Sequence, residues 1–183
     1  SPQALAKLKK YDADLFVSMS FDQILKKQII CLPKMGFLNC HAGALPFYRG
    51  RNILNWALIN DEKEFGVTVH FIDEGIDTGD IILQKKRVIS DKDDYSTLLK
   101  KAEILCAECL YEAIIKVNSG DFERIKQKSI HPYGSYFFKR KKGDERINWN
   151  STSRDIFNFV RALTNPGPCA QTLINKKILK LRK

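Results

Sequence analysis

The sequence lacks any long apolar run, although 44% of its 183 residues are hydrophobic. A transmembrane helix needs about 20 consecutive apolar residues, so none is expected. The first stretch, SPQALAKLKKYDADL, is charged and amphipathic and has no apolar core, so we also expect no signal peptide. Internal repeats and low-complexity tracts are absent. This length and composition predict one well-buried domain with a small appendage.

Cysteine is sparse and its count of five is odd. We interpret these residues as reduced and the protein as cytoplasmic. Cys106 and Cys109 form a CxxC pair, but they lie in an apolar helical pattern with no second cysteine or histidine pair nearby. We therefore interpret them as buried positions on a helix face and expect no metal site.

Acidic residues are outnumbered, since 31 Lys and Arg against 21 Asp and Glu give a formal net charge of +10. Much of the excess lies in residues 124–146 and in the final stretch NKKILKLRK. A polyanionic partner, such as tRNA or a nucleotide diphosphate, accounts for this charge. A lysine-rich solvated surface accounts for it equally well, so charge alone does not identify the partner.

Alternating strand and helix patterns predict an α/β fold with a mostly parallel sheet. Strands are predicted over 12–20, 36–40, 65–72 and 80–88, and helices over 21–34, 51–62, 93–120 and 150–163. The final segment, 170–183, has the pattern of a hairpin with its turn near Asn175 and Lys176.

Polar residues gather at the end of one predicted strand and in one loop. Asn39 and His41 are two positions apart, so in an extended chain they face the same way. The loop DEGIDTGD, residues 73–80, is the other concentrated polar turn. Ligands of α/β sheets bind beyond the carboxyl ends of strands, so we expect the chemistry there. Taken singly, Asn39, His41 and Asp77 are equally typical of turns and ordinary polar sites.

Two motifs in this order, NCHAGALPFYRGR and GVTVHFIDEGIDTGDIILQ, resemble the formyltransferases that use 10-formyltetrahydrofolate. That family includes methionyl-tRNA formyltransferase, glycinamide ribonucleotide transformylase and the nucleotide-sugar N-formyltransferases. The resemblance covers roughly residues 11–178, and the chain resembles a central fragment of such an enzyme. It implies a Rossmann-like catalytic fold lacking its N-terminal units. The expected parts are a partial catalytic domain (1–122), a basic, aromatic linker or substrate-facing arm (123–150), and a helix with the start of a β-rich region (151–183).

By that match, Asn39, His41 and Asp77 take the positions of the family's catalytic Asn, His and Asp. The chemistry of the residues agrees with this, because formyl transfer to an amine develops an oxyanion and must move a proton off the amine. The Asn39 amide and a protonated His41 can donate to that oxygen. Asp77 can hold His41 in its charged form and relay the amine's proton.

The resemblance implies N10-formyltetrahydrofolate as co-substrate and no metal. The folate is expected along SMSFDQIL and against the backbone of DEGIDTG. The expected folate contacts are Phe21, Gln23, Ile24, Leu25, Asp73 and Gly75. The expected supporting residues are His70, Thr78 and Asp80, with the Asp80 carboxylate anchoring the loop by accepting backbone N–H bonds. Packing within the strand suits His70 equally well. Phe21 and Ile24 suit an ordinary core equally well.

The stretch YRGRNILNW resembles the enzymes that formylate dTDP-linked 4-amino- and 3-amino-dideoxysugars, as in O-antigen and lipopolysaccharide biosynthesis. This implies a nucleotide sugar as the small-molecule acceptor, no membrane partner, and a homodimer. The residues expected on the sugar side are Arg49, Arg51, Asn52 and Trp56, with structural roles for Arg51 and Trp56 as the alternative. The residues able to stack a base or clamp a diphosphate are Tyr133, Tyr136, Phe137 and Arg140, which suit a solvent-facing arm or dimer contact as well.

Two alternatives remain open. The first keeps the chemistry and makes methionyl-tRNA the acceptor, which the basic charge favours and the RNILNW stretch does not. Nucleic acid is therefore the second choice of partner. The other alternative is a basic binding module that retains the scaffold without turnover.

Overall fold

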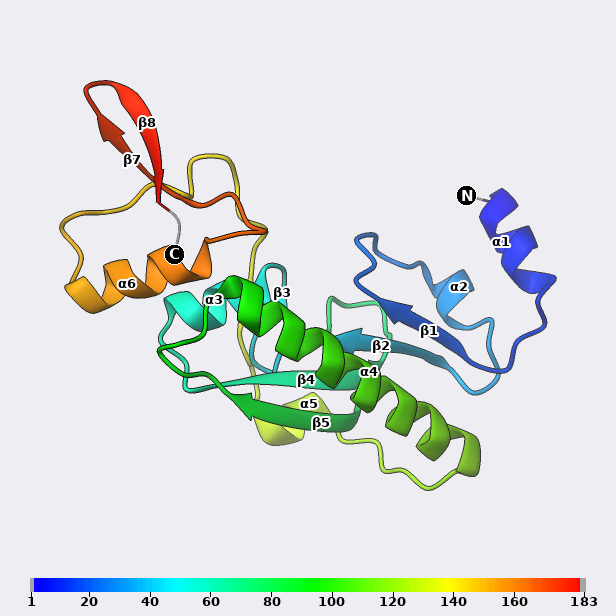
Figure 1. Cartoon of the computed structure of the whole chain (residues 1–183). Coiled ribbons are helices and arrows are strands. Elements are labelled where there is room, and N and C mark those ends of the chain that lie inside the picture. The colour runs from blue at the N-terminus through cyan, green and yellow to red at the C-terminus, as the bar shows by residue number, and fades with distance from the viewer. Residues whose placement is uncertain (1, 182–183) are drawn as a thin grey trace.

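The computed structural model describes residues 2–181 (Figure 1). The helices are α1 (Pro2–Lys9), α2 (Lys27–Ile30), α3 (Ile53–Ile59), α4 (Tyr95–Ser119), α5 (Gln127–Ile130) and α6 (Ser153–Ala162). The strands are β1 (Phe16–Met19), β2 (Phe37–His41), β3 (Arg49–Gly50), β4 (Glu64–Phe71), β5 (Ile81–Val88), β6 (Tyr136–Phe137), β7 (Ala170–Ile174) and β8 (Lys177–Leu181). No helix among these residues is long and apolar enough to span a bilayer.

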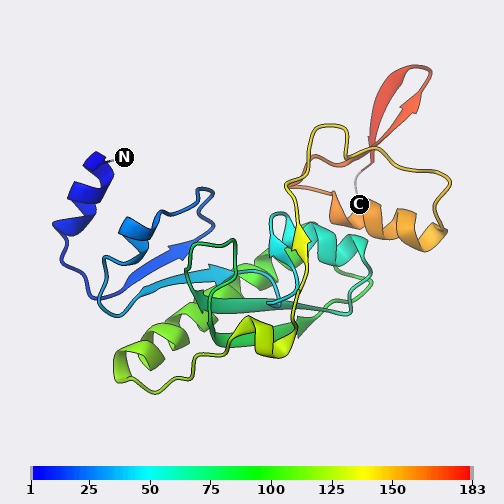
Figure 2. The ribbon, with the colours of Figure 1, turned by 180° about the vertical axis from the view of Figure 1, so that it is seen from behind.

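The main sheet has four strands in the order β1-β2-β4-β5. β1 and β2 pair in parallel, as expected, while β4 and β5 continue the sheet in antiparallel pairing. The α/β class is confirmed, together with a small antiparallel β part at the C-terminal end. In Figures 1 and 2, α4 lies across one face of this sheet, and α6 and the β7–β8 hairpin lie at the end remote from α1.

The core lies between the sheet and α4. Buried side chains of β2 and β4, such as Leu38 and Val67, meet Leu98 and Leu105 of α4 in one apolar cluster. Cys106 and Cys109 are also buried in this cluster, as the sequence predicts. The helix is amphipathic because its buried positions recur about every three to four residues.

The start of α4 is fixed by a capping box. The Asp94 carboxylate accepts from the Thr97 backbone N–H at 3.0 Å, and the Thr97 hydroxyl accepts from the Asp94 backbone N–H at 3.0 Å. The other end closes at Gly120, whose φ of 74° lies in the left-handed region that favours glycine.

Replacing Asp94 by alanine is expected to lower the free energy of unfolding by about 1 kcal/mol, because it removes the acceptor for an orphan helix N–H. Urea unfolding followed by circular dichroism measures the change. Asp121→Ala, at an exposed position after the other end of the helix, is the control. Equal effects of the two substitutions would contradict the capping role.

The segment between α4 and α6 contains α5 and β6 and runs back to β3. β6 pairs in parallel with β3, with Arg49 opposite Tyr136 and Gly50 opposite Phe137. Phe137 also stacks on Tyr48, with ring centroids 4.8 Å apart. This part of the expected linker therefore packs against the loop that follows β2.

The last strands form the expected hairpin. β7 and β8 pair antiparallel from Ala170–Leu181 to Ile174–Lys177. Asn175 and Lys176 both have positive φ, 49° and 63°, which is the type I′ geometry that suits a two-residue hairpin turn.

Candidate active site

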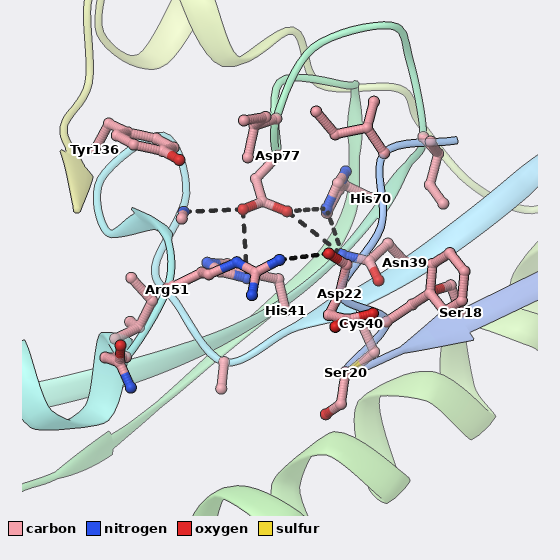
Figure 3. A pocket seen from close by; sticks show the side chains of 18 of the residues that line it. Ser18, Ser20, Asp22, Asn39, Cys40, His41, Arg51, His70, Asp77 and Tyr136 are labelled. Carbon is pink, nitrogen blue, oxygen red and sulfur yellow. Dashed lines mark hydrogen bonds and ion pairs between the residues drawn. The ribbon is translucent and has the colours of Figure 1, made fainter. Parts of the chain in front are cut away.

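The side chains of Asn39 and His41 both lie close to the carboxylate of Asp77 (Figure 3). Asn39 and His41 come from β2, and Asp77 from the loop between β4 and β5. The Asn39 amide nitrogen lies 3.5 Å from Oδ1 of Asp77, and Nδ1 of His41 lies 3.7 Å from Oδ2. The structure thus brings together the three residues that the sequence singles out. The alternation of a strand explains it, since the intervening Cys40 points the other way, toward the Cys106 carbonyl.

His70 is the fourth member of this cluster. The β2–β4 register sets it directly opposite Asn39, and its Nδ1 lies 2.7 Å from the Phe71 carbonyl. Nδ1 therefore carries the proton, which leaves Nε2 to accept from the Asn39 amide at 3.2 Å. His70 thereby fixes the orientation of the Asn39 side chain.

His41 is held by a backbone carbonyl. Its Nε2 lies 2.7 Å from the Tyr48 oxygen, so Nε2 donates and Nδ1 faces Asp77. Gly43 permits this approach, because a Cβ there would lie 2.5 Å from Nε2 of His41. Burial lowers the pKa of His41 below 6.5, although the Asp77 charge and the Tyr48 carbonyl act in the opposite sense. This differs from the protonated imidazole expected from the sequence, since desolvation favours the neutral ring.

Asp77 is a buried, ionised carboxylate. Burial raises its pKa, but the nearby His70 and His41 rings and the Gly50 N–H together lower the pKa to about 2. The Gly50 N–H donates to Oδ2 at 2.9 Å. The backbone of Asp77 has φ 53°, a left-handed conformation that costs a non-glycine residue roughly 1–2 kcal/mol. Such a conformation is maintained only where the surroundings fix it.

The cluster opens onto a cavity of about 590 Å³. Its wall is lined by the three predicted catalytic residues, by all six predicted folate contacts and by His70. Among the residues predicted on the sugar side, Arg51 and Asn52 line the cavity and Arg49 and Trp56 do not. The lining also includes Ser18, Ser20 and Asp22, which belong to the SMSFDQIL stretch expected along the folate, and Tyr95, which the sequence analysis did not single out.

Arg49 and Trp56 hold residues 127–140 in place. The Arg49 guanidinium donates to the Gln127 side-chain oxygen at 2.7 and 3.1 Å. Trp56 stacks on Phe137 with centroids 5.4 Å apart, and Arg140 lies over the same indole. Both side chains thus contact residues 127–140 rather than the cavity.

The loop between β4 and β5 is organised by Asp73. Its Oδ1 accepts from the Gly75 N–H at 3.0 Å and from the Thr78 hydroxyl at 2.5 Å. Thr78 thus supports the loop from outside the cavity lining. Asp80 anchors the loop through its backbone carbonyl, which accepts from Phe71 at 2.9 Å, rather than by accepting backbone N–H bonds with its carboxylate as expected.

Tyr136 of β6 also lines the cavity, so the segment expected to be a linker or arm completes the site. Arg51 reaches the other wall and donates to the Asp22 carbonyl. Among residues 2–181, no group of three or more His, Cys, Asp and Glu side chains is arranged to hold a metal ion.

Comparison with known proteins agrees with this arrangement. Residues 1–114 match the profile described as "Formyl transferase", and residues 139–183 match "Formyl transferase, C-terminal domain". Over 179 residues the chain is 41% identical to the methionyl-tRNA formyltransferase of Thermodesulfovibrio yellowstonii, covering 98% of this chain and 57% of that protein. The chain thus spans little more than half the length of this relative.

Solved structures give the same fold. An N-formyltransferase from Helicobacter canadensis, in complex with folinic acid and dTDP-3-aminofucose, is 34% identical, with a TM-score of 0.69 over 80% of this chain and 54% of that one. A sugar N-formyltransferase from Shewanella has a TM-score of 0.82 at 22% identity, covering all of this chain and 74% of its own. The first profile matches residues 1–114 of the 183, which is more than half of the chain. The chain therefore belongs to the formyl transferase family.

Proposed function

We propose that the protein of which this chain is part transfers a formyl group from N10-formyltetrahydrofolate to the amino group of methionyl-tRNA. The observation that carries formyl transfer is the meeting of the Asn39 amide, the His41 imidazole and the Asp77 carboxylate at one cavity wall. A hydrogen-bond donor, a neutral base and a fixed charge are the groups that acyl transfer to an amine requires.

The cavity suits a folate in size and lining. Its volume of about 590 Å³ falls within the range of roughly 300–1,000 Å³ found for organic ligands. Phe21, Ile24 and Leu25 offer apolar contacts on one wall, and the 73–77 backbone offers polar groups on the other. Bound folate supplies the activated formyl group, and these residues orient it toward Asn39.

The proton route follows from the tautomers. Asn39 donates to the formyl oxygen as negative charge develops on it, with its amide oriented by His70. His41 is neutral, and its Nδ1 can take the proton that the attacking amine releases. The Asp77 carboxylate, 3.7 Å away, stabilises the resulting imidazolium, which gives the proton to N10 of the folate as the bond between N10 and the formyl carbon breaks.

Methionyl-tRNA is favoured as acceptor by two observations. The relatives with 41% and 39% identity are methionyl-tRNA formyltransferases. The chain also carries a formal charge of +10, and the C-terminal hairpin adds Lys176, Lys177 and Lys180 to it. Cationic surfaces of this kind bind the phosphate backbone of RNA.

An amino sugar on dTDP is the second candidate. The 34% identical structure holds dTDP-3-aminofucose, and the YRGRNILNW stretch places Arg51 and Asn52 on the cavity wall.

Labelled 10-formyltetrahydrofolate, incubated with the protein and either initiator methionyl-tRNA or a dTDP-amino-sugar, separates the two acceptors. We expect label on methionyl-tRNA, with uncharged tRNA as the control. Label on the sugar alone would replace tRNA by the second candidate. Transfer to neither acceptor, by protein shown to be folded, would overturn the proposed function.

The pH profile of kcat/KM is expected to have its acid limb below pH 6.5. Burial lowers the pKa of His41, so the ring stays neutral as the pH falls through 6.5 and gains its proton only further down. Asp77, with a pKa of about 2, stays ionised throughout this range. In Asp77→Asn the limb is expected to move lower still, because the charge that raises the His41 pKa is gone. A limb at or above 6.5 would contradict a neutral His41.

A further inference from the structure

One buried amide links the segment after α4 to the proposed catalytic loop. Gln127, the first residue of α5, is 3% exposed and does not line the cavity. Its side-chain nitrogen donates to the carbonyls of Asp77 and Gly79, both at 2.8 Å. Its side-chain oxygen accepts from Nε and Nη2 of Arg49 at 3.1 and 2.7 Å.

The orientation of this amide is determined by its partners. Two carbonyls can only accept and a guanidinium can only donate, so exchanging the nitrogen and oxygen of Gln127 would lose all four hydrogen bonds. Arg49 therefore locks the amide so that its N–H groups point at the loop. Arg49 is in turn tied to the Tyr133 carbonyl at 3.4 Å.

Strand β3, which contains Arg49, also holds the side chain of Asp77. Gly50, next to Arg49, donates to the carboxylate at 2.9 Å, while Gln127 holds the backbone of the same residue. Ile125 adds a second anchor, because it exchanges two backbone hydrogen bonds with Ile81 at 2.9 Å each. Hydrogen bonds to its carboxylate and to its carbonyl thus hold Asp77 in the left-handed conformation.

We propose that Gln127, locked by Arg49, is a positioning residue that sets the placement of the Asp77 carboxylate in the site. This rests on the proposed function in so far as Asp77 takes part in formyl transfer. Gln127, which lies between the two matched family profiles, then supports the site without lining the cavity.

Gln127→Glu is the decisive variant. It keeps the acceptor for Arg49 but turns a carboxylate oxygen toward two carbonyl oxygens, which repel it and displace the loop. We expect kcat to fall about tenfold or more with the KM for the formyl donor changed less than about twofold, since misplacing a group by about 1 Å can cost roughly 10²-fold. Gln84→Glu is the matched control, because Gln84 also donates two hydrogen bonds of 2.8 Å, to Leu45 and Thr68.

A second readout does not need turnover. The chain has three histidines, so NMR titration of labelled imidazoles follows His41 and His70 directly. Gln127→Met removes both N–H donors without changing the charge near His41. In this variant the titration of His41 is expected to shift to lower pH, because Asp77 withdraws, whereas Gln84→Met keeps the wild-type curve. Gln127→Leu is expected to shift His41 in the same direction, and it decides the matter if Gln127→Met does not fold. Wild-type curves in a folded Gln127→Met or Gln127→Leu protein would overturn the proposal. Absence of formyl transfer by the wild-type protein would count against the proposed function only.

Discussion

Replacing Asn39 by alanine is expected to lower kcat for formyl transfer about 10²–10³-fold, because a single donor to a developing oxyanion contributes about 2.7–4 kcal/mol. Asn39 lies on the cavity wall, and His70 and Asp77 orient its amide at 3.2 and 3.5 Å. The truncation removes the donor and leaves the β2 backbone in place. Steady-state kinetics with the labelled formyl donor measures the effect.

The control for this substitution is Asn118→Ala, at an exposed position near the end of α4. It is expected to keep wild-type kcat. Asn39→Asp is a stricter companion, since it keeps the shape and replaces the donor by a charge facing Asp77. If Asn39→Ala retained more than about a third of wild-type kcat while folded, Asn39 would not be a donor in the transition state.

Replacing Arg161 by methionine is expected to cost about 3–5 kcal/mol of the free energy of unfolding, because it leaves the partners of a buried charge unsatisfied. Arg161 of α6 is 1% exposed. It donates to the Ser90 carbonyl at 2.8 Å and to the Asn158 side chain at 2.9 Å, and it lies 3.5 Å from the Asp61 carboxylate. These contacts dock α6 against α3 and the loop before α4. Urea unfolding measures the loss.

Arg154→Met is the matched comparison. Arg154 lies on the same helix and pairs with the same Asp61 carboxylate at 2.5 Å, but its side chain is 39% exposed. Solvent screens such pairs, so only a small part of the Arg161 effect is expected. Equal losses for the two variants would show that burial of Arg161 adds nothing to the docking of α6.

Local signals in the sequence determined several features of this protein. The Asp94 cap and Gly120 bound α4, the Asn175–Lys176 pair makes the hairpin turn, and two-residue alternation turns Asn39 and His41 to one side. Each of these depends on backbone preferences and hydrogen bonds within a few residues, which a single chain segment carries by itself. The two motifs that resemble the formyltransferases likewise indicated the family to which the chain belongs.

Other features were decided only by the tertiary structure. Burial lowers the pKa of His41, and no pattern in the sequence reports desolvation. Arg49 does not line the cavity, because its guanidinium donates to Gln127, which lies 78 positions later. Gln127 in turn reaches Asp77 across 50 positions. Hydrogen bonds over such separations leave no periodicity or local motif, so only the folded chain reveals which amide holds the carboxylate.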